Sequence, residues 1–210
     1  MQYYSQIGQD RWVKSVLNNK RDGYFVELGA CDGLHLSNTL YFERNLNWNG
    51  ICIEPSDAFY KDLSINRKCN VSNCLISSYE GETVDFSHCG AVSGILDEHT
   101  GIFTTKDSVV KKTTTTLASV LDQFNAPEII DYLSLDVEGQ EYNILRTFPF
   151  DKYKFRCITV EHNAPHVGNT LQLKIRDILT RNGYTFVKGN DDVHKWGHGP
   201  IDDFYVCATI

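Results

Sequence analysis

The sequence predicts an α/β fold of the Rossmann-like kind, with helices on both faces of a seven-stranded, mostly parallel sheet. Two observations predict this class: apolar, strand-like runs alternate with helical patterns, and seven such runs occur in the 210 residues. Strands that alternate with helices are typical of parallel sheets, because each crossover places a helix against one face. No composition shift marks a linker, so we expect a single domain over residues 1–210.

The first part of the chain supplies three of the strands. Val13, Val16 and Leu17 have helical spacing, and Gly23 separates this helical pattern from the apolar run Tyr24–Leu28. Ser37 is a residue type that caps helices. In chain order we expect a helix over 6–17, a strand over 24–28, a helix over 37–46, a strand over 51–54, a short helix over 58–63 and a strand over 70–76.

The second part of the chain begins after a stretch without clear periodicity. Residues 81–112 are rich in glycine, threonine and polar side chains, and they indicate an irregular insertion that either shapes an acceptor site or forms a surface excursion. Leu117, Val120, Leu121 and Phe124 then show the i, i+3, i+4, i+7 spacing of a helix. We further expect a strand over 130–137, a helix over 142–147, a strand over 157–160, a helix over 171–179 and strands over 184–187 and 204–209.

Charge and cysteine content narrow the function classes. The net charge of −7 argues against a nucleic-acid partner, because phosphate contacts dominate such binding and need a basic surplus. No apolar run approaches the roughly 20 residues that span a bilayer, and the N-terminus lacks the pattern of a signal peptide. The seven cysteines are odd in number and show no CxxC spacing, which favours a reducing, cytoplasmic location.

Two strand ends predict an adenosine-containing ligand. Gly29 and Gly33 follow the first strand and allow a sharp turn and a close ligand approach. Glu54 ends the second strand, 21 residues beyond Gly33, where a carboxylate can accept hydrogen bonds from both hydroxyls of a ribose. Ligands of such sheets bind beyond the carboxyl ends of the strands, where these residues lie.

The glycine spacing distinguishes between two cofactors. Dinucleotide sites normally show GxGxxG, whereas this turn has Gly29-x-x-x-Gly33. Glu27 and Asp32 would repel a pyrophosphate but suit the ammonium of a methionine moiety, so S-adenosylmethionine fits better than NAD. Ser37 and Asn38 of the next helix either hydrogen-bond the methionine carboxylate or only cap the helix.

A second set of polar side chains follows two later strands. Asp136 and Glu138 leave the strand over 130–135, and Glu161 and His162 leave the next strand. Carboxylates at the end of an apolar strand are costly unless they are paired, hydrated or bound to a cation. We expect these four side chains to converge beside the nucleotide.

Three interpretations of this cluster stay open. Magnesium or manganese held by Asp136, Glu161 and His162 could bind two acceptor hydroxyls and lower the pKa of one. Alternatively, His162 or a carboxylate is a general base, which makes Asp136, Glu138 and His162 the candidate catalytic residues. In the plainest interpretation, Asp136 orders the cofactor and Glu138 caps a helix. Candidates for an acceptor pocket in later loops are His166, His194, Lys195, Trp196 and His198.

Six segments carry a family resemblance. They are residues 5–10 (SQIGQD), 25–33 (FVELGACDG), 36–39 (LSNT), 48–55 (WNGICIEP), 130–139 (IDYLSLDVEG) and 202–205 (DDFY). With these segments the chain resembles the FkbM-type family of S-adenosylmethionine-dependent methyltransferases over nearly its whole length. The resemblance implies a class I methyltransferase sheet with an antiparallel last strand, and methyl transfer to oxygen, commonly to a hydroxyl of a sugar or natural product.

The resemblance also implies site residues. Gly29, Gly33 and Glu54 correspond to cofactor contacts, and Gln6 and Gln9 resemble part of a lid over the cofactor. Together with the residues argued above, the expected cofactor contacts are Gln9, Glu27, Gly29, Ala30, Asp32, Gly33, Ser37, Asn38, Glu54 and Ser77.

These observations predict an S-adenosylmethionine-dependent O-methyltransferase that acts on a hydroxyl of a small molecule, most of all a sugar or glycan. Trp196 favours a carbohydrate, because an indole can stack on a sugar ring. Two other classes stay open: an NAD-dependent oxidoreductase, and a non-catalytic adenosine-binding module. The sequence does not determine the acceptor, the methylated position or the oligomeric state.

Overall fold

The computed structural model describes residues 2–96, 108–189 and 201–210, and its centre is a seven-stranded sheet. The strand order is β10-β11-β9-β8-β1-β2-β3, and β11, the last strand, runs antiparallel to both neighbours. This confirms the predicted sheet. Its strands are β1 (Tyr24–Leu28), β2 (Asn49–Ile53), β3 (Asn70–Ser72), β8 (Ile129–Leu135), β9 (Lys154–Glu161), β10 (Tyr184–Gly189) and β11 (Asp202–Cys207).

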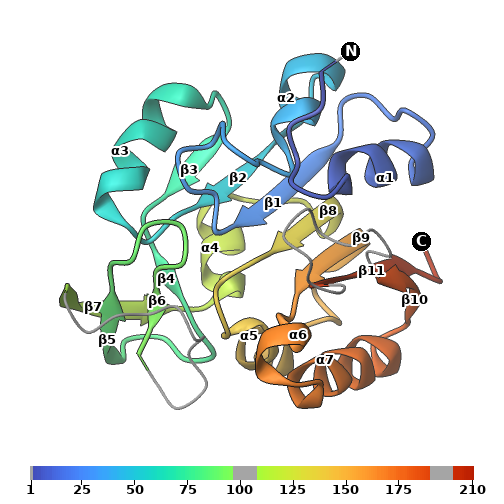
Figure 1. The fold of residues 1–210 in the computed structure, drawn as a ribbon. Helices are drawn as coiled ribbons and strands as arrows, with labels where there is room; N and C mark the ends of the chain where they lie inside the picture. The colour runs from blue at the N-terminus through green and yellow to red at the C-terminus, as the bar shows by residue number, and fades with distance from the viewer. Residues whose placement is uncertain (1, 97–107, 190–200) are drawn as a thin grey trace.

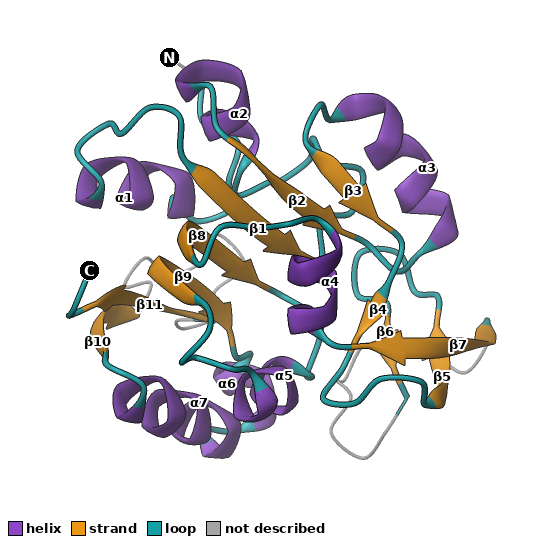
Figure 2. Ribbon diagram, turned by 180° about the vertical axis from the view of Figure 1, so that it is seen from behind, coloured by secondary structure: helices purple, strands orange, loops and turns teal. Residues whose placement is uncertain are grey.

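Helices cover both faces of this sheet (Figures 1 and 2). One face packs against α1 (Gln9–Val16), α2 (Leu40–Leu46) and α3 (Asp57–Asn66), and these helices share one buried apolar cluster with the sheet. The other face packs against α4 (Leu117–Gln123), α5 (Glu141–Thr147) and α7 (Thr170–Arg181), whose apolar side chains form a second cluster. The short helix α6 (Ala164–Val167) precedes α7.

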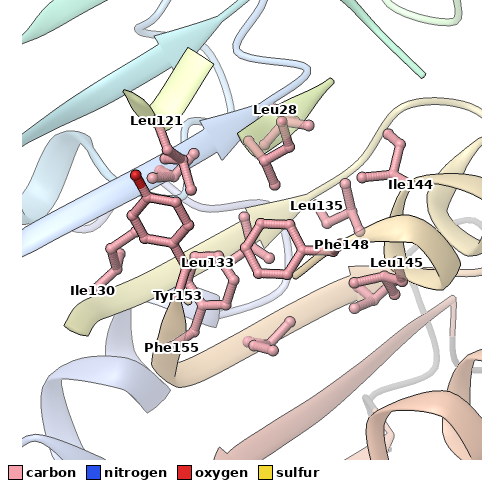
Figure 3. Packing of buried hydrophobic residues seen from close by; sticks show 14 of the residues in the cluster. Leu28, Leu121, Ile130, Leu133, Leu135, Ile144, Leu145, Phe148, Tyr153 and Phe155 are labelled. Carbon is pink, nitrogen blue, oxygen red and sulfur yellow. The ribbon is translucent and has the colours of Figure 1, made fainter. Parts of the chain in front are cut away.

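The central strands are buried on both faces, which explains why they appear in the sequence as continuous apolar runs. Successive side chains of a strand point to opposite faces. Phe25 of β1 therefore joins the cluster of α1, α2 and α3, while its neighbour Val26 joins the cluster of α4, α5 and α7. Figure 3 shows the second cluster, with Leu121 of α4, Ile144 of α5 and Leu133 of β8 among its side chains. Burial of each such side chain contributes about 1.5–3 kcal/mol.

A second, smaller sheet corrects the prediction for residues 81–112. Its order is β4-β7-β5-β6, made from β4 (Leu75–Ile76), β5 (Thr83–Ser87), β6 (Gly94–Ile95) and β7 (Val109–Thr115). For the described part of 81–112 the predicted irregular insertion is therefore wrong, while residues 97–107 lie outside the described residues. The single strand predicted over 70–76 is also wrong, because it divides into β3 and β4. The polar composition conceals these strands because β5 and β7 bury only part of their side chains, and the β-branched run of β7 is the signal for a strand.

The two sheets meet at the carboxyl ends of the large sheet. In both ribbon views the small sheet lies on the side toward which the arrowheads of β1 and β2 point (Figures 1 and 2). Within the described ranges, no helix has the length and apolar character needed to cross a membrane.

Candidate functional site

A cavity of about 430 Å³ lies where the two sheets meet. Its walls come from the ends of β1, β2, β8 and β9 on one side, and from Phe86 and residues 90–95 of the small sheet on the other. The volume falls in the range of small-molecule sites. A parallel sheet brings these strand ends to one edge, so the topology creates the site.

The turn after β1 approaches the end of β8 very closely. Gly29 has φ +77°, and a Cβ added there would lie 1.9 Å from the backbone oxygen of Asp136. Only glycine fits both the backbone conformation and this distance. The following residues, Ala30, Cys31 and Asp32, line the cavity, and Asp32 Oδ1 accepts hydrogen bonds from the backbone of the residues that follow. The structure therefore places Gly29, Ala30 and Asp32 at the cavity, as the sequence predicted.

Glu54 projects from the end of β2 into the same cavity and is 4% exposed. Its Oε2 accepts a hydrogen bond from Cys31 N at 2.9 Å, and its Oε1 accepts one from Ser56 N at 2.7 Å. Each carboxylate oxygen can accept a further hydrogen bond, so two donors of a ligand fit here. Burial raises the pKa of Glu54, and the two backbone N–H groups oppose that rise.

Glu27 lines the cavity, but protein donors already occupy its carboxylate. Oε1 accepts a hydrogen bond from Asn38 N at 2.6 Å, Oε2 accepts one from Thr39 Oγ1, and Ser37 Oγ lies within bonding distance of both oxygens. Arg67 adds an ion pair at 3.2 Å. The side chain is therefore an anchor for the chain around residues 37–39, and the predicted direct contact between Glu27 and a ligand ammonium is not supported by this geometry.

Asn38, which also lines the cavity, has a buried oxygen without a hydrogen-bond donor. Its Nδ2 donates to Ser134 Oγ at 2.8 Å, whereas its Oδ1 is buried and has no hydrogen-bond partner. A buried acceptor without a donor costs about 1–3 kcal/mol. Asn38 and Ser37, two of the expected cofactor contacts, both line the cavity. Ser37 Oγ also accepts from Leu40 N at 3.1 Å, so its capping role is real as well.

Three carboxylates meet at the ends of β8 and β9. One oxygen each of Asp136, Glu138 and Glu161 lies within 4.8 Å of the others, and all three residues line the cavity. Glu141 shapes the turn that presents Glu138, because its carboxylate accepts hydrogen bonds from Val137 N at 2.9 Å and from Gly139 N. The role of helix-start acceptor thus belongs to Glu141, and Glu138 is free to face the cavity.

Burial and mutual repulsion raise the pKa of every member of this cluster. Desolvation is the main reason why the pKa of Asp136 rises to about 6, and a hydrogen bond from Glu161 opposes this rise. Desolvation and the nearby Asp136 raise the pKa of Glu138 to about 9 and that of Glu161 well above its ordinary value. At neutral pH the cluster therefore holds a proton on Glu138 and mostly a negative charge on Asp136, and burial shifts Glu161 toward its neutral form.

His162 is wrong as a predicted catalytic and metal-binding residue. Its ring is 1% exposed and does not line the cavity. Nδ1 accepts a hydrogen bond from Ala164 N at 3.1 Å, and Nε2 lies 3.0 Å from Gln172 Nε2 and 3.4 Å from Asp203. Glu161 and His162 follow each other at the end of β9, and consecutive side chains of a strand point to opposite sides. Glu161 takes the cavity side, so Glu138 replaces His162 in the carboxylate group.

Three predicted cofactor contacts lie outside the cavity wall as described. Gln9 is buried and donates to Asp202 Oδ2 at 2.9 Å, so it holds the N-terminal segment while Gln6 reaches the cavity. Gly33 lies beneath the wall, packed against Arg67. Ser77 follows β4, pairs its N–H with Thr115 O at 2.9 Å and faces the α4 side instead.

The acceptor-pocket candidates divide in two. His166 lies in α6 and is not among the residues that line the cavity. His194, Lys195, Trp196 and His198 lie outside the described residues.

Sequence reasoning missed Asn163 as part of the wall and left the opposite wall open. Asn163 lines the cavity and donates to Glu161 Oε2 at 2.7 Å, which orients that carboxyl group. Its position directly after a strand was the available signal. Phe86 and residues 90–95 form the opposite wall, in line with the alternative that residues 81–112 shape a site, although nothing local in the sequence places the small sheet against the ends of β1 and β2.

Comparison with known proteins gives a family and a fold. The Methyltransferase FkbM domain matches residues 27–186. A precorrin-6y C5,15-methyltransferase from Geobacter metallireducens GS-15 is similar at a TM-score of 0.50 and 12% identity, over 94% of this chain and 87% of that chain. A putative rRNA methylase from Clostridium thermocellum is similar at 0.53 and 11%, over 98% and 97%. The METTL16 methyltransferase domain is similar at 0.50 and 10%, over 95% and 66%. No curated protein matches the chain.

Proposed function

The chain belongs to the FkbM methyltransferase domain family, and from this membership we propose that it transfers the methyl group of S-adenosylmethionine to a hydroxyl oxygen of a sugar or glycan. The observation that carries the proposal is the shared cavity: Glu54 at one end and the carboxylates Asp136, Glu138 and Glu161 at the other line the same space. A cofactor held by Glu54 would thus lie beside groups that can accept a proton.

The described residues fit the adenosyl and methionine parts of this cofactor. Glu54 has one free acceptor position on each oxygen, which suits the two hydroxyls of a ribose. The orphaned Oδ1 of Asn38 suits a donor such as the ammonium of the methionine part. Membership of this family favours a methyltransferase over an NAD-dependent oxidoreductase, and the missing GxGxxG turn agrees with that preference.

When bound, S-adenosylmethionine supplies an electrophilic methyl group on a positively charged sulfur. The residues of the chain orient the acceptor and remove its proton. Asp136, with a pKa of about 6, is mostly ionised at neutral pH and accepts the hydroxyl proton as general base. Glu138 keeps its proton and donates a hydrogen bond to a neighbouring oxygen of the acceptor, while Glu161 is hydrogen-bonded to Asp136 and holds that carboxylate in place. Holding both reactants in one geometry supplies much of the acceleration.

A divalent cation, in place of protons on this cluster, is the alternative form of the proposal. Asp136, Glu138 and Glu161 would hold it, since three carboxylate oxygens suit magnesium or manganese. Such an ion would orient acceptor hydroxyls and lower the pKa of one. A histidine ligand would favour manganese, but His162 does not join this group, so its oxygen ligands suit magnesium and manganese alike.

The lining of the cavity supports a neutral, hydroxyl-rich acceptor. Among the described residues, no lysine or arginine lines it, whereas six acidic side chains do. Vicinal hydroxyls donate well to carboxylates, whereas the phosphates of a nucleic acid need cationic partners. A polynucleotide acceptor is therefore an outcome to be tested and not the expected one.

The free cysteines support a reducing location. None of the seven cysteines forms a disulfide, and the sulfurs of Cys52 and Cys69 lie 3.7 Å apart as thiols. We therefore keep the cytoplasm as the proposed site of action. Alkylation of the protein from freshly lysed cells tests this, with seven modified thiols expected after unfolding and a disulfide-linked peptide as the contrary result.

The test of the function is transfer of a labelled methyl group from S-adenosylmethionine to panels of glycans, free sugars and RNA. We expect labelled sugar hydroxyls with the wild type and loss of labelling with Asp136→Asn. Labelling of RNA alone would refute the acceptor class. Cofactor binding without labelling of any acceptor would favour the non-catalytic adenosine-binding module.

A further inference from the structure

A buried arginine lies behind the cofactor end of the cavity. Arg67 directly follows α3, and its side chain is 0% exposed. A guanidinium without water is costly unless it is paired and hydrogen-bonded. Arg67 does not line the cavity, so ligand contact does not explain its position.

The guanidinium connects three separate segments. Nε donates to Glu43 of α2 at 3.2 Å, and Nη1 forms the ion pair with Glu27 of β1, also at 3.2 Å. Nη1 further donates to Ser37 Oγ at 3.1 Å, and Nη2 donates to Thr39 Oγ1 at 2.9 Å. Residues 33–39, which we call the 33–39 loop, are thus held by Arg67 from behind while Asn38 faces the cavity from the front.

The glycine at position 33 of the turn after β1 has a physical reason in these contacts. Gly33 has φ +76°, and a Cβ added there would lie 2.7 Å from Cγ of Arg67 and 2.6 Å from Cδ1 of Leu63. Arg67 Nη1 also approaches Gly33 O at 3.4 Å. Gly33 therefore makes room for the arginine and does not make room for a ligand.

A series of contacts connects Arg67 to the cavity. Arg67 fixes Glu27, and Glu27 Oε1 accepts the hydrogen bond from Asn38 N at 2.6 Å. Asn38 then presents its orphaned Oδ1. Glu54, at the ribose end, has its own anchors on Cys31 and Ser56 and makes no contact with Arg67 among those described.

We propose that Arg67 is a positioning residue that sets the 33–39 loop for the methionine end of the cofactor and leaves the adenosyl end unaffected. This inference rests on the proposed function. Lysine cannot replace the arginine, because one ammonium group cannot reach Glu27, Thr39 and Glu43 together as the planar guanidinium does.

Two ligands that differ in the methionine part test the inference. S-adenosylhomocysteine contains both ends, and 5′-methylthioadenosine lacks the amino-acid part. We expect Arg67→Lys to weaken binding of S-adenosylhomocysteine by about tenfold in calorimetry, about 1.4 kcal/mol, while the Kd of 5′-methylthioadenosine changes by less than about twofold. A purely structural role would lower the thermal unfolding temperature and affect both ligands equally.

The matched control is Arg156→Met. Arg156 Nε pairs with buried Asp131 at 3.2 Å, near the starts of β9 and β8 and away from the strand ends that line the cavity, so this variant also removes an arginine from a carboxylate. We expect it to bind both ligands as the wild type does. If Arg67→Lys does not fold, Thr39→Val takes its place in the test. Thr39 hydrogen-bonds both Glu27 and Arg67, and its replacement by valine removes these bonds without changing the charge of the protein.

The outcomes separate this inference from the function on which it rests. If the wild type binds neither ligand, the proposed function fails and the inference fails with it. If the wild type binds both, equal weakening of both ligands by the variant, or no weakening of either, refutes the role of Arg67 alone.

Discussion

Replacement of Glu54 by alanine tests the cofactor end of the cavity. The carboxylate is 4% exposed and accepts backbone hydrogen bonds from Cys31 and Ser56 at 2.9 and 2.7 Å. Two further acceptor positions are left for ribose hydroxyls, and a hydrogen bond to a charged group contributes about 1.5–3 kcal/mol. Because the alanine variant loses these while water partly compensates, we expect S-adenosylhomocysteine to bind about 1–3 kcal/mol more weakly, roughly a five- to 150-fold rise in Kd.

The assay is calorimetric titration with S-adenosylhomocysteine near neutral pH, next to thermal unfolding of each variant. Glu54→Gln keeps the shape and one acceptor oxygen, so it should show an intermediate loss. Asp122→Ala is the control, because this carboxylate is 51% exposed and pairs with Lys152 on the α4 side of the fold. Wild-type affinity in a folded Glu54→Ala protein would refute the reasoning, as would an equal loss in the Asp122 control.

Three further predictions concern the turn, the carboxylates and the cation. Gly29→Ala should lower the free energy of unfolding in urea by more than Gly81→Ala, for which we expect a loss of about 1–2 kcal/mol. Both glycines have positive φ, but of the two only a Cβ at residue 29 meets a backbone atom, at 1.9 Å. Equal losses in the two variants would contradict this prediction. In EDTA, the unfolding temperature of the wild type should fall relative to that of Glu138→Gln as pH rises from about 5 to about 8. The folded protein keeps a proton on Glu138 up to about pH 9 that the unfolded chain loses near its ordinary pKa of 4.5, so stability falls across that window, and a difference independent of pH would contradict the assignment. Calorimetric titration with manganese or magnesium should show binding to the wild type and none to Glu161→Gln, whereas no heat with the wild type would remove the ion from the proposal.

The parts of the fold that could be predicted are those encoded by local pattern. β1, which contains Phe25 and Val26, and β8, which contains Leu133, are buried on both faces, so their apolar runs are continuous and easy to recognise. Glu54 and Asp136 could be placed because the topology brings the residues after parallel strands to one edge.

The errors come from long-range packing and from strand geometry. Gly33 appeared to be a ligand contact because no local signal shows that Arg67, 34 residues later, packs against it. His162 was assigned to the cavity although it directly follows Glu161 at a strand end, where alternation sends one of the two side chains away. The small sheet escaped prediction because its strands are short and partly polar.

A crystal structure with S-adenosylhomocysteine bound tests the central claim most directly, namely that the ends of β1 and β2 hold the adenosyl part of the cofactor. We predict density in the 430 Å³ cavity, with both ribose hydroxyls on Glu54 and the amino-acid end next to Asn38, within reach of Asp136. Density at another place on the protein, or a ribose that does not touch Glu54, would contradict the account.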